Sequence, residues 1–222
     1  MNTYSLLAKA YEATIDDVLY AMYLNLLKKH THPSALLEAG CGTGYLSREL
    51  ARMGYDVTGM DSNPSMLELA SFYAGEENVT VDYKVHDLTE PFSGQFDVII
   101  MPFDVVNHIE GQINVEKALT HITRALKPQS ILIFDLLDQQ FMDDLVGYEE
   151  TIHFDGGELR WRVTRFSNQA IKHEIEVGEQ SASHQEYYYS EAVVQEMLGS
   201  YDLLERLPLN GRAIYVMRKK EE

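Results

Sequence analysis

The sequence has few of the features that would place it in several common classes of protein. Its 222 residues include a single cysteine, Cys41, so a disulfide framework is excluded and a reducing compartment is expected. No apolar run approaches the roughly 18 residues of a membrane span, and the first residues lack the basic region and apolar core of a secretion signal. We therefore expect a cytoplasmic protein that makes no membrane contact.

Basic residues are also scarce. Only 18 lysines and arginines stand against 35 aspartates and glutamates, which gives a formal net charge of -17. Such a charge repels phosphate backbones, so DNA is not an expected partner. The apolar share of 45% and the charged share of 24% are those of an ordinary globular chain. We expect a single domain, 1–222, that acts as a monomer or a homodimer.

The chain does contain a glycine-rich motif. Gly40, Gly42 and Gly44 follow a short apolar run that ends in Glu38, and apolar residues at helical spacing come next. This pattern predicts a strand, a tight loop and a helix. Glycine permits positive φ and lets a flat ligand lie on the peptide groups, although such turns also occur as plain packing devices. A dinucleotide fingerprint is not met, because Tyr45 stands where its third glycine would be.

Alternating strands and helices follow as far as Leu137. Strands are expected at 57–60, 79–85, 96–101 and 131–137, with helices after Pro64 and at 114–126. Repeated βα units of this length predict a parallel sheet with helices on both faces. The fold class is therefore α/β, a Rossmann-like, doubly wound and mostly parallel seven-stranded sheet.

The two ends of the chain differ from this core. Residues 1–30 predict two helices, and their tyrosines, Tyr11 and Tyr20 among them, suit either a lid over a ligand or a helix interface. Short alternating segments separated by glycine and asparagine predict an antiparallel insertion at 149–190, after the fifth strand. A helix at 191–200 and strands at 203–207 and 213–218 close the chain.

Acidic residues stand at two predicted strand ends, the edge where open parallel sheets bind ligands. Asp61 ends the second strand and can accept hydrogen bonds from both hydroxyls of a ribose, and Asp87 ends the third and can accept from an adenine amine. Met66 could pack on the adenine face. In isolation, Asp61 could equally cap a helix and Asp87 could be a turn residue.

These motifs, in this order, resemble those of the class I S-adenosylmethionine (SAM)-dependent methyltransferases over about residues 35–137. The match includes Glu38 with its glycines, both strand-end acids and the fourth strand, whereas Gln129 and Ser130 replace two glycines of a later turn. The N-terminal tyrosines and residues 104–108 are similar to those of small bacterial methyltransferases. The resemblance implies SAM as cofactor, with S-adenosylhomocysteine as product. The cofactor-binding residues that it implies are Tyr11, Tyr20, Glu38, Gly40, Cys41, Gly42, Gly44, Asp61, Ser62, Met66, Asp87, Leu88 and Met101.

A SAM-dependent enzyme mainly holds an acceptor in line with the activated methyl group. We expect a small-molecule acceptor with a nitrogen or oxygen nucleophile, and Asp104 and His108 as candidate catalytic bases. His108 could instead cap or pack the next helix. No metal is expected, because histidines 30, 32, 153, 173 and 184 show no tight ligand spacing. The alternative to an enzyme is a SAM-binding sensor or partner-binding module.

The insertion contains a basic patch of Arg160, Arg162 and Arg165. With Tyr187 or Tyr189, one of these arginines could hold an anionic group of the acceptor. The other interpretation is that the arginines pair across the hairpin with Glu174 and Glu176.

Overall fold

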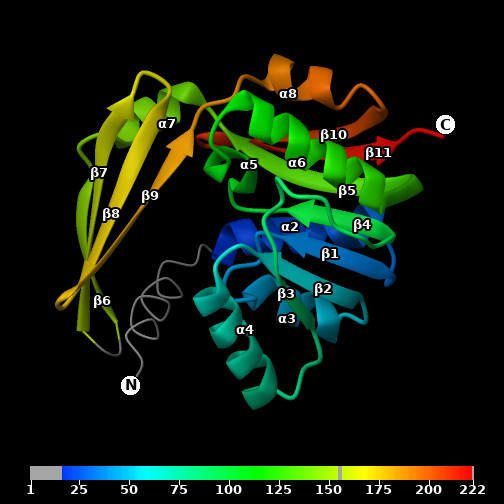
Figure 1. Ribbon diagram of the computed structural model, residues 1–222, viewed down its shortest axis with the longest axis horizontal. Helices are drawn as coiled ribbons and strands as arrows, with labels where there is room; N and C mark the ends of the chain where they lie inside the picture. The colour runs from blue at the N-terminus through cyan, green and yellow to red at the C-terminus, as the bar shows by residue number, and fades with distance from the viewer. Residues whose placement is uncertain (1–16, 155–156, 222) are drawn as a thin grey trace.

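The computed structural model of the protein describes residues 17–154 and 157–221, and the expected helix and tyrosines before residue 17 lie outside this range. The main sheet has seven strands in the order β10-β11-β5-β4-β1-β2-β3 (Figure 1). They are β1 (Ala35–Ala39), β2 (Asp56–Asp61), β3 (Asp82–Val85), β4 (Phe96–Met101), β5 (Leu126–Leu137), β10 (Tyr201–Leu209) and β11 (Arg212–Lys219). Strands β1 to β5 pair in parallel, and β11 pairs antiparallel with both β5 and β10. The predicted fold class is confirmed.

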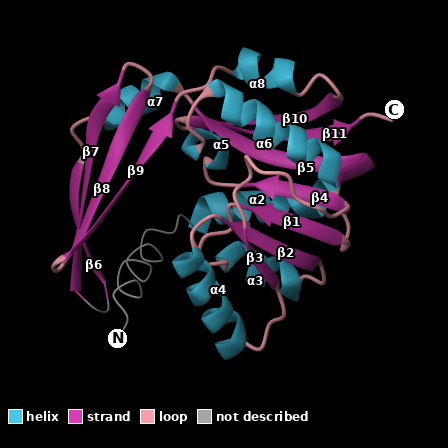
Figure 2. Ribbon diagram, viewed as in Figure 1, coloured by secondary structure: helices cyan, strands magenta, loops and turns pink. Residues whose placement is uncertain are grey.

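Helices cover both faces of this sheet (Figure 2). They are α2 (Asp17–His30), α3 (Tyr45–Arg52), α4 (Pro64–Glu76), α5 (Val105–His108), α6 (Gln112–Ala125), α7 (Gln139–Leu145) and α8 (Glu191–Met197). Successive side chains of β1 point to opposite faces, so Leu36 packs with α2 and α3, whereas Leu37 packs with α6 and α8. The continuous apolar runs of the sequence are therefore strands buried on both faces.

Local signals explain several element boundaries. The N-cap of α4, Asn63, accepts a hydrogen bond from the Ser65 amide, and Pro64 occupies the first turn. Two short helices, α5 and α7, were not expected from the sequence, although Asp138 caps α7 by accepting from the Phe141 amide. Gln129 adopts φ 63°, so the turn keeps a left-handed residue where the family pattern has glycine.

A second sheet stands beside the main one (Figure 1). Its four antiparallel strands, in the order β6-β7-β8-β9, are β6 (Glu149–Phe154), β7 (Gly157–Ser167), β8 (Ala170–Val177) and β9 (Gln180–Tyr187). Val163 and Ile171 pack against Leu137 and against Met142 of α7, which attaches this sheet to the end of β5. The second sheet occupies the region predicted as an antiparallel insertion.

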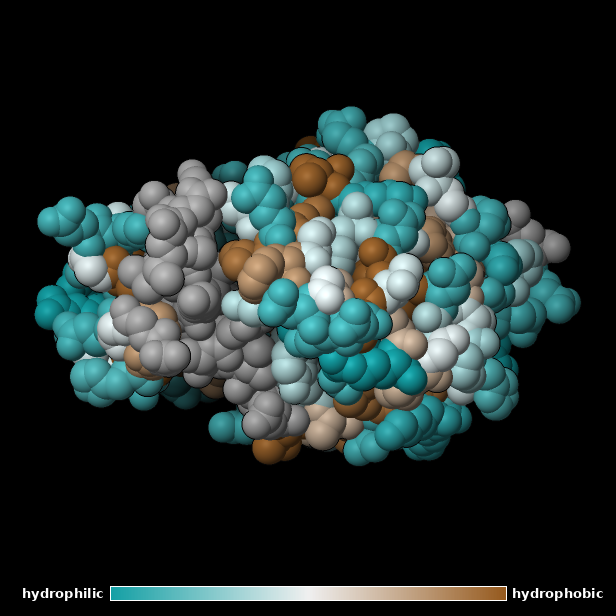
Figure 3. Space-filling model, turned by 90° about the horizontal axis from the view of Figure 1, so that it is seen from below, coloured by the Kyte–Doolittle hydropathy of each residue, from teal (hydrophilic) through white to brown (hydrophobic). Residues whose placement is uncertain are grey.

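The described surface is mostly polar. Exposed large apolar side chains are scattered over different elements, and in Figure 3 apolar residues form separate patches among polar ones. None of the helices in residues 17–154 and 157–221 combines the length and apolar character that crossing a bilayer requires.

Candidate functional site

A large cavity opens between the carboxyl ends of the main-sheet strands and the second sheet. Its volume is about 1140 Å³, ample for a small-molecule site, since such sites measure roughly 300–1,000 Å³. One side is lined by the loops after β1, β2 and β3, and the other by residues of β7, β8 and β9. The start of α2, the segment after β4, Phe141 of α7 and the connection between β10 and β11 also contribute to the lining.

The glycine loop after β1 is shaped partly by packing and partly by the cavity. A Cβ on Gly40 would lie 2.4 Å from a methyl carbon of Val105, and one on Gly44 would lie 2.2 Å from the Tyr83 hydroxyl. Gly40 and Gly42 line the cavity with positive φ, and the Gly42 amide donates to Asp61 Oδ2 at 2.9 Å. Gly44 is not among the lining residues, so its close approach is to Tyr83 rather than to the cavity.

Asp61 and Asp87 reach the same cavity from neighbouring strands. Besides Gly42, the Asp61 carboxylate accepts from the Asn63 amide at 2.8 Å, and each oxygen has further acceptor capacity. Asp87 Oδ1 accepts from the amide and the hydroxyl of Thr89, and these hydrogen bonds hold the Asp87 pKa below its usual value. Asp87 thus makes the expected local turn, whereas Asp61 is not the cap of α4, which is Asn63; both acids also line the cavity.

Glu38, near the end of β1 and directly before the glycine loop, lines the cavity and is 2% exposed. Burial raises its pKa to about 8, against the lowering effect of the hydrogen bond donated by the Ser47 hydroxyl. A buried carboxyl of this kind suits a cationic amino group placed beside it.

Of the remaining predicted cofactor residues that the structure describes, all but one line the cavity. Cys41, Ser62, Met66 and Leu88 line the cavity, as does Tyr20, whose ring packs on Phe103 at a centroid distance of 4.2 Å. Met101 is fully buried in the core and does not line the cavity, because its side chain faces α6 rather than the strand end. Tyr11 lies outside the described residues.

This lining fits SAM. Glycine peptides give a close-approach cradle, two strand-end carboxylates can accept from ribose hydroxyls and an adenine amine, and Glu38 can face an ammonium group. The fit rests on the chemistry of these donors and acceptors.

The segment after β4 places Asp104 and His108 on the other side of the cavity. Phe103 and Asp104 both have φ near 60°, a conformation that costs energy for residues other than glycine and clusters at functional sites. The Asp104 amide donates to Asp135 Oδ1 at 3.1 Å, which holds this turn in place. Asp104 Oδ2 then lies 3.5 Å from His108 Nε2.

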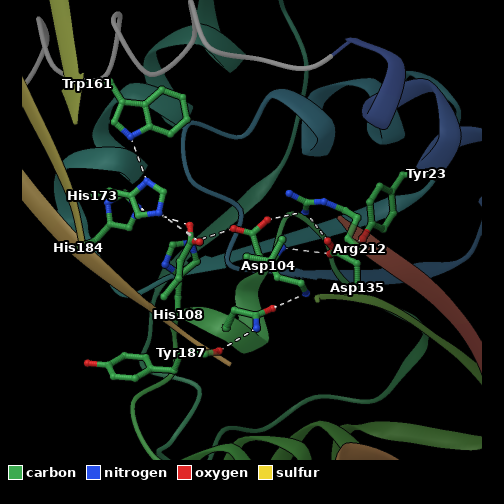
Figure 4. Close-up of polar contacts among 12 residues, drawn as sticks. Tyr23, Asp104, His108, Asp135, Trp161, His173, His184, Tyr187 and Arg212 are labelled. Carbon is green, nitrogen blue, oxygen red and sulfur yellow. Dashed lines mark hydrogen bonds and ion pairs between the residues drawn. The ribbon is translucent and has the colours of Figure 1, made fainter. Parts of the chain in front are cut away.

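A buried network that sequence reasoning missed supports this turn (Figure 4). Asp135, on β5, is completely buried, and it accepts a hydrogen bond of 2.6 Å from the Tyr23 hydroxyl. Arg212, at the start of β11, contacts both Asp135 and Asp104. Burial raises the pKa of Asp135, and the Arg212 charge opposes that rise. An isolated acid inside the apolar run 131–137 was the signal in the sequence.

The second sheet brings a histidine cluster to the cavity (Figure 4). His173 and His184 stand directly opposite each other on β8 and β9, and their rings stack with centroids 4.7 Å apart. Glu186 lies 3.2 Å from His173 Nε2 and 3.8 Å from His184 Nε2. The Trp161 indole N–H donates to His173 Nδ1 at 3.0 Å. His173 is 3% exposed, so this histidine is a buried one.

Burial and neighbouring charges shift the pKa values of the groups in this cluster, upward for one group and downward for two others. Burial lowers the pKa of His108, but the hydrogen bond and charge of Asp104, together with Glu186, raise it to about 9. Burial and the two neighbouring histidines lower the pKa of His184. The pKa of Glu186 is lowered, because its interactions with the nearby His173 and His184 rings outweigh burial.

The arginine patch lies away from the cavity. Arg160 pairs with Glu158 at 2.9 Å, Arg162 with Glu149 at 3.0 Å and Arg165 with Asp143 at 2.6 Å. The last two pairs reach β6 and α7, so the closest ion pairs are not those expected with Glu174 and Glu176, although these glutamates stand opposite Arg162 and Arg160. No arginine of the patch lines the cavity, which leaves their predicted role in substrate binding without structural support.

The two predicted substrate tyrosines also separate. Tyr187 lines the cavity, whereas Tyr189 is buried and donates its hydroxyl hydrogen to the Ile109 carbonyl.

Residues 37–134 match a family model described as a methyltransferase domain. A protein of Geobacillus sp. (strain WCH70), assigned by its name to the methyltransferases, is 30% identical over 151 residues, which are 64% of this chain and 61% of that protein. The ubiquinone biosynthesis O-methyltransferase of Rickettsia akari (strain Hartford) is 28% identical over 50% of this chain and 43% of its own length. This chain thus spans less than two thirds of these curated relatives.

Solved structures share the whole fold. The SAM-dependent methyltransferase of Clostridium acetobutylicum ATCC 824 has a TM-score of 0.83 at 19% identity, covering 99% of this chain and 100% of that one. CalS10, an amino pentose methyltransferase from Micromonospora echinaspora solved with bound SAM, has a TM-score of 0.75 at 18% identity, covering 99% and 98%. At these identities the likeness concerns the fold, including the second sheet.

Proposed function

We propose that the chain is a class I SAM-dependent methyltransferase that uses SAM as its cofactor and methylates a nitrogen or oxygen of a small-molecule acceptor. One observation carries the proposal. A single cavity joins the glycine loop and strand-end acids on one side to Asp104, His108 and the second sheet on the other. Cofactor and acceptor can therefore meet in one space that is bounded by protein on several sides.

On the cofactor side, five groups carry the proposed contacts. Asp61 takes the ribose hydroxyls, Asp87 the adenine amine and Glu38 the amino group of the methionine part. Met66 and Leu88 supply apolar surface for the adenine ring. When bound, SAM supplies a methyl group that its sulfonium has already activated.

On the acceptor side, Asp104 and His108 are the groups proposed to contact the nucleophile. Because the pKa of about 9 keeps His108 protonated at neutral pH, Asp104 is the group proposed to receive the proton. Arg212 holds Asp104 in place, and Tyr20 with Phe103 helps to exclude water from the space between. The arginine patch does not line the cavity, so an anionic group on the acceptor is no longer part of the proposal.

The relatives support both kinds of nucleophile. Solved structures of the same fold include an amino pentose methyltransferase and a sugar N-methyltransferase, and the curated relatives include O-methyltransferases. An acceptor amine would meet an acidic lining, since Asp104, Glu110 and Glu186 all face the cavity.

Replacing Asp61 tests the cofactor half of the proposal. Asp61→Ala should weaken SAM binding by about 1.5–3 kcal/mol, as expected for lost hydrogen bonds to a charged group. Calorimetry measures the affinity, and circular dichroism checks the fold, because Asp61 also holds the Gly42 amide. Asp56→Ala, at the other end of the same strand and exposed, is the matched control. Unchanged affinity in Asp61→Ala would mean that the ribose lies elsewhere.

Transfer itself is tested with SAM carrying a radioactive methyl group and fractionated cytosolic metabolites. Label in a small molecule supports the proposal. SAM binding without any labelled acceptor would instead indicate a sensor or a partner-binding module.

A further inference from the structure

Three potential metal ligands converge at the acceptor end of the cavity. His184 and Glu186 are two residues apart on β9 and so share one face of the strand, and His108 approaches them from the end of α5 (Figure 4). One ligand atom from each of the three lies within 4.8 Å of the others. All three residues line the cavity.

The spacing is close to that of a bound ion. Metal–nitrogen and metal–oxygen bonds of about 2.0–2.2 Å place neighbouring ligand atoms roughly 3–3.5 Å apart. His184 Nε2 and Glu186 Oε1 are already 3.8 Å apart, and a separation at the 4.8 Å limit has to shorten by roughly 1.3–1.8 Å. Small side-chain rotations can supply that change.

An independent observation comes from His173, behind the cluster. The Trp161 N–H can only donate, so His173 Nδ1 accepts and the ring proton of neutral His173 stands on Nε2. That buried Nε2 lies 3.2 Å from Glu186 Oε2 but makes no hydrogen bond of good geometry with any described residue. If Glu186 binds an ion through Oε1, this unpaired N–H stands where it can donate to Oε2 and orient the carboxylate.

We propose that His108, His184 and Glu186 bind one divalent first-row transition metal ion. Two imidazoles and one carboxylate are the ligands of catalytic zinc and of non-haem iron sites, and imidazole disfavours magnesium and calcium. The cavity side of the site stays open for water. Resting on the proposed function, these open positions suit an oxygen or nitrogen of the acceptor.

The chain carries its own reporter for the test. Trp161 is the only tryptophan, and its ring lies 5.6 Å from that of His173. Protein freed of metal with a chelator is titrated with Co²⁺, without SAM, while tryptophan fluorescence and visible absorption are followed. We expect saturable quenching at one ion per chain and the visible absorption of protein-bound Co²⁺. Calorimetry with Zn²⁺ gives a second measure of affinity.

Variants locate the site. His184→Ala and Glu186→Gln should each weaken binding about tenfold or more, while His153→Ala, which removes an exposed histidine of β6, should not change it. If one ligand variant does not fold, His108→Ala replaces it. Absence of saturable binding to the wild type overturns the proposal, and so does equal affinity in the ligand variants. Because SAM is absent, this result is independent of the Asp61 and methyl-transfer experiments.

Discussion

At the scale of single residues, Arg212 balances the charge at the centre of the site. It contacts Asp104 and the fully buried Asp135, so its removal leaves a carboxylate uncompensated in the interior. Arg212→Met should lower the free energy of unfolding by about 3–5 kcal/mol at neutral pH. Arg160→Met, at an exposed pair with Glu158, should change it by less than about 1 kcal/mol. Denaturant unfolding measures both.

A double variant checks that the loss comes from the unpaired buried carboxylate. Adding Asp135→Asn to Arg212→Met should recover part of the loss, because no buried charge then remains unpaired at that position. Equal stabilities of the Arg212 and Arg160 variants would contradict a central role for this ion pair.

A second prediction at this scale concerns Glu38 and pH. Burial raises its pKa to about 8, so between its ordinary value and pH 8 the folded chain holds a proton that the unfolded chain has lost. This contribution to stability is complete below the ordinary value and disappears as pH rises through about 8. Glu38→Gln lacks it, so its melting temperature should fall less than that of the wild type between pH 5 and 9. Over the same range, the free energy of unfolding of the wild type should fall by a few kcal/mol more than that of the variant, on the order expected for this pKa shift. If the melting temperatures of Glu38→Gln and the wild type fall by the same amount over this pH range, Glu38 is already ionised in the folded state.

At the scale of elements, α2 has two different ends. Tyr23, Leu26 and Leu27 are buried in the core, whereas Val18, Tyr20 and Met22 line the cavity. Among the described residues, the lid predicted for 1–30 is therefore proposed only for 17–22. On SAM binding, amide hydrogen exchange in 17–22 should slow, and exchange in 24–30 should stay unchanged as a control within the same helix. Equal behaviour of both segments would make α2 a purely structural helix.

At the scale of the whole molecule, the cavity exists because the second sheet is attached at the carboxyl edge of the first. Asn107, completely buried, donates to the Tyr187 carbonyl of β9 at 2.8 Å and accepts from the Leu137 amide of β5 at 3.1 Å. One side chain thus links α5 to both sheets beside Asp104 and His108. The packing of Val163 and Ile171 against α7 adds a second attachment. The acceptor side of the cavity is therefore built from both sheets together.

The sequence by itself determined the parallel core and the cofactor side of the cavity. Apolar periodicity defines the strands, and in a parallel sheet all carboxyl ends meet at one edge, so Asp61 and Asp87 had to approach the glycine loop. Each such residue is placed by its immediate neighbours in the chain. Met101 and Gly44 are exceptions among the described residues, because the Met101 side chain points into the core and Gly44 packs against Tyr83.

Only the tertiary structure decided the acceptor side. Asp135 and Arg212 meet because β5 and β11 pair, and His173 and His184 meet through the register of β8 with β9. Alternation in β7 showed that Trp161 and Arg162 point to opposite faces, but not which face would turn toward the cavity. That choice depends on how the second sheet packs against the first, through contacts between residues far apart in the chain, and local periodicity carries no information about such contacts.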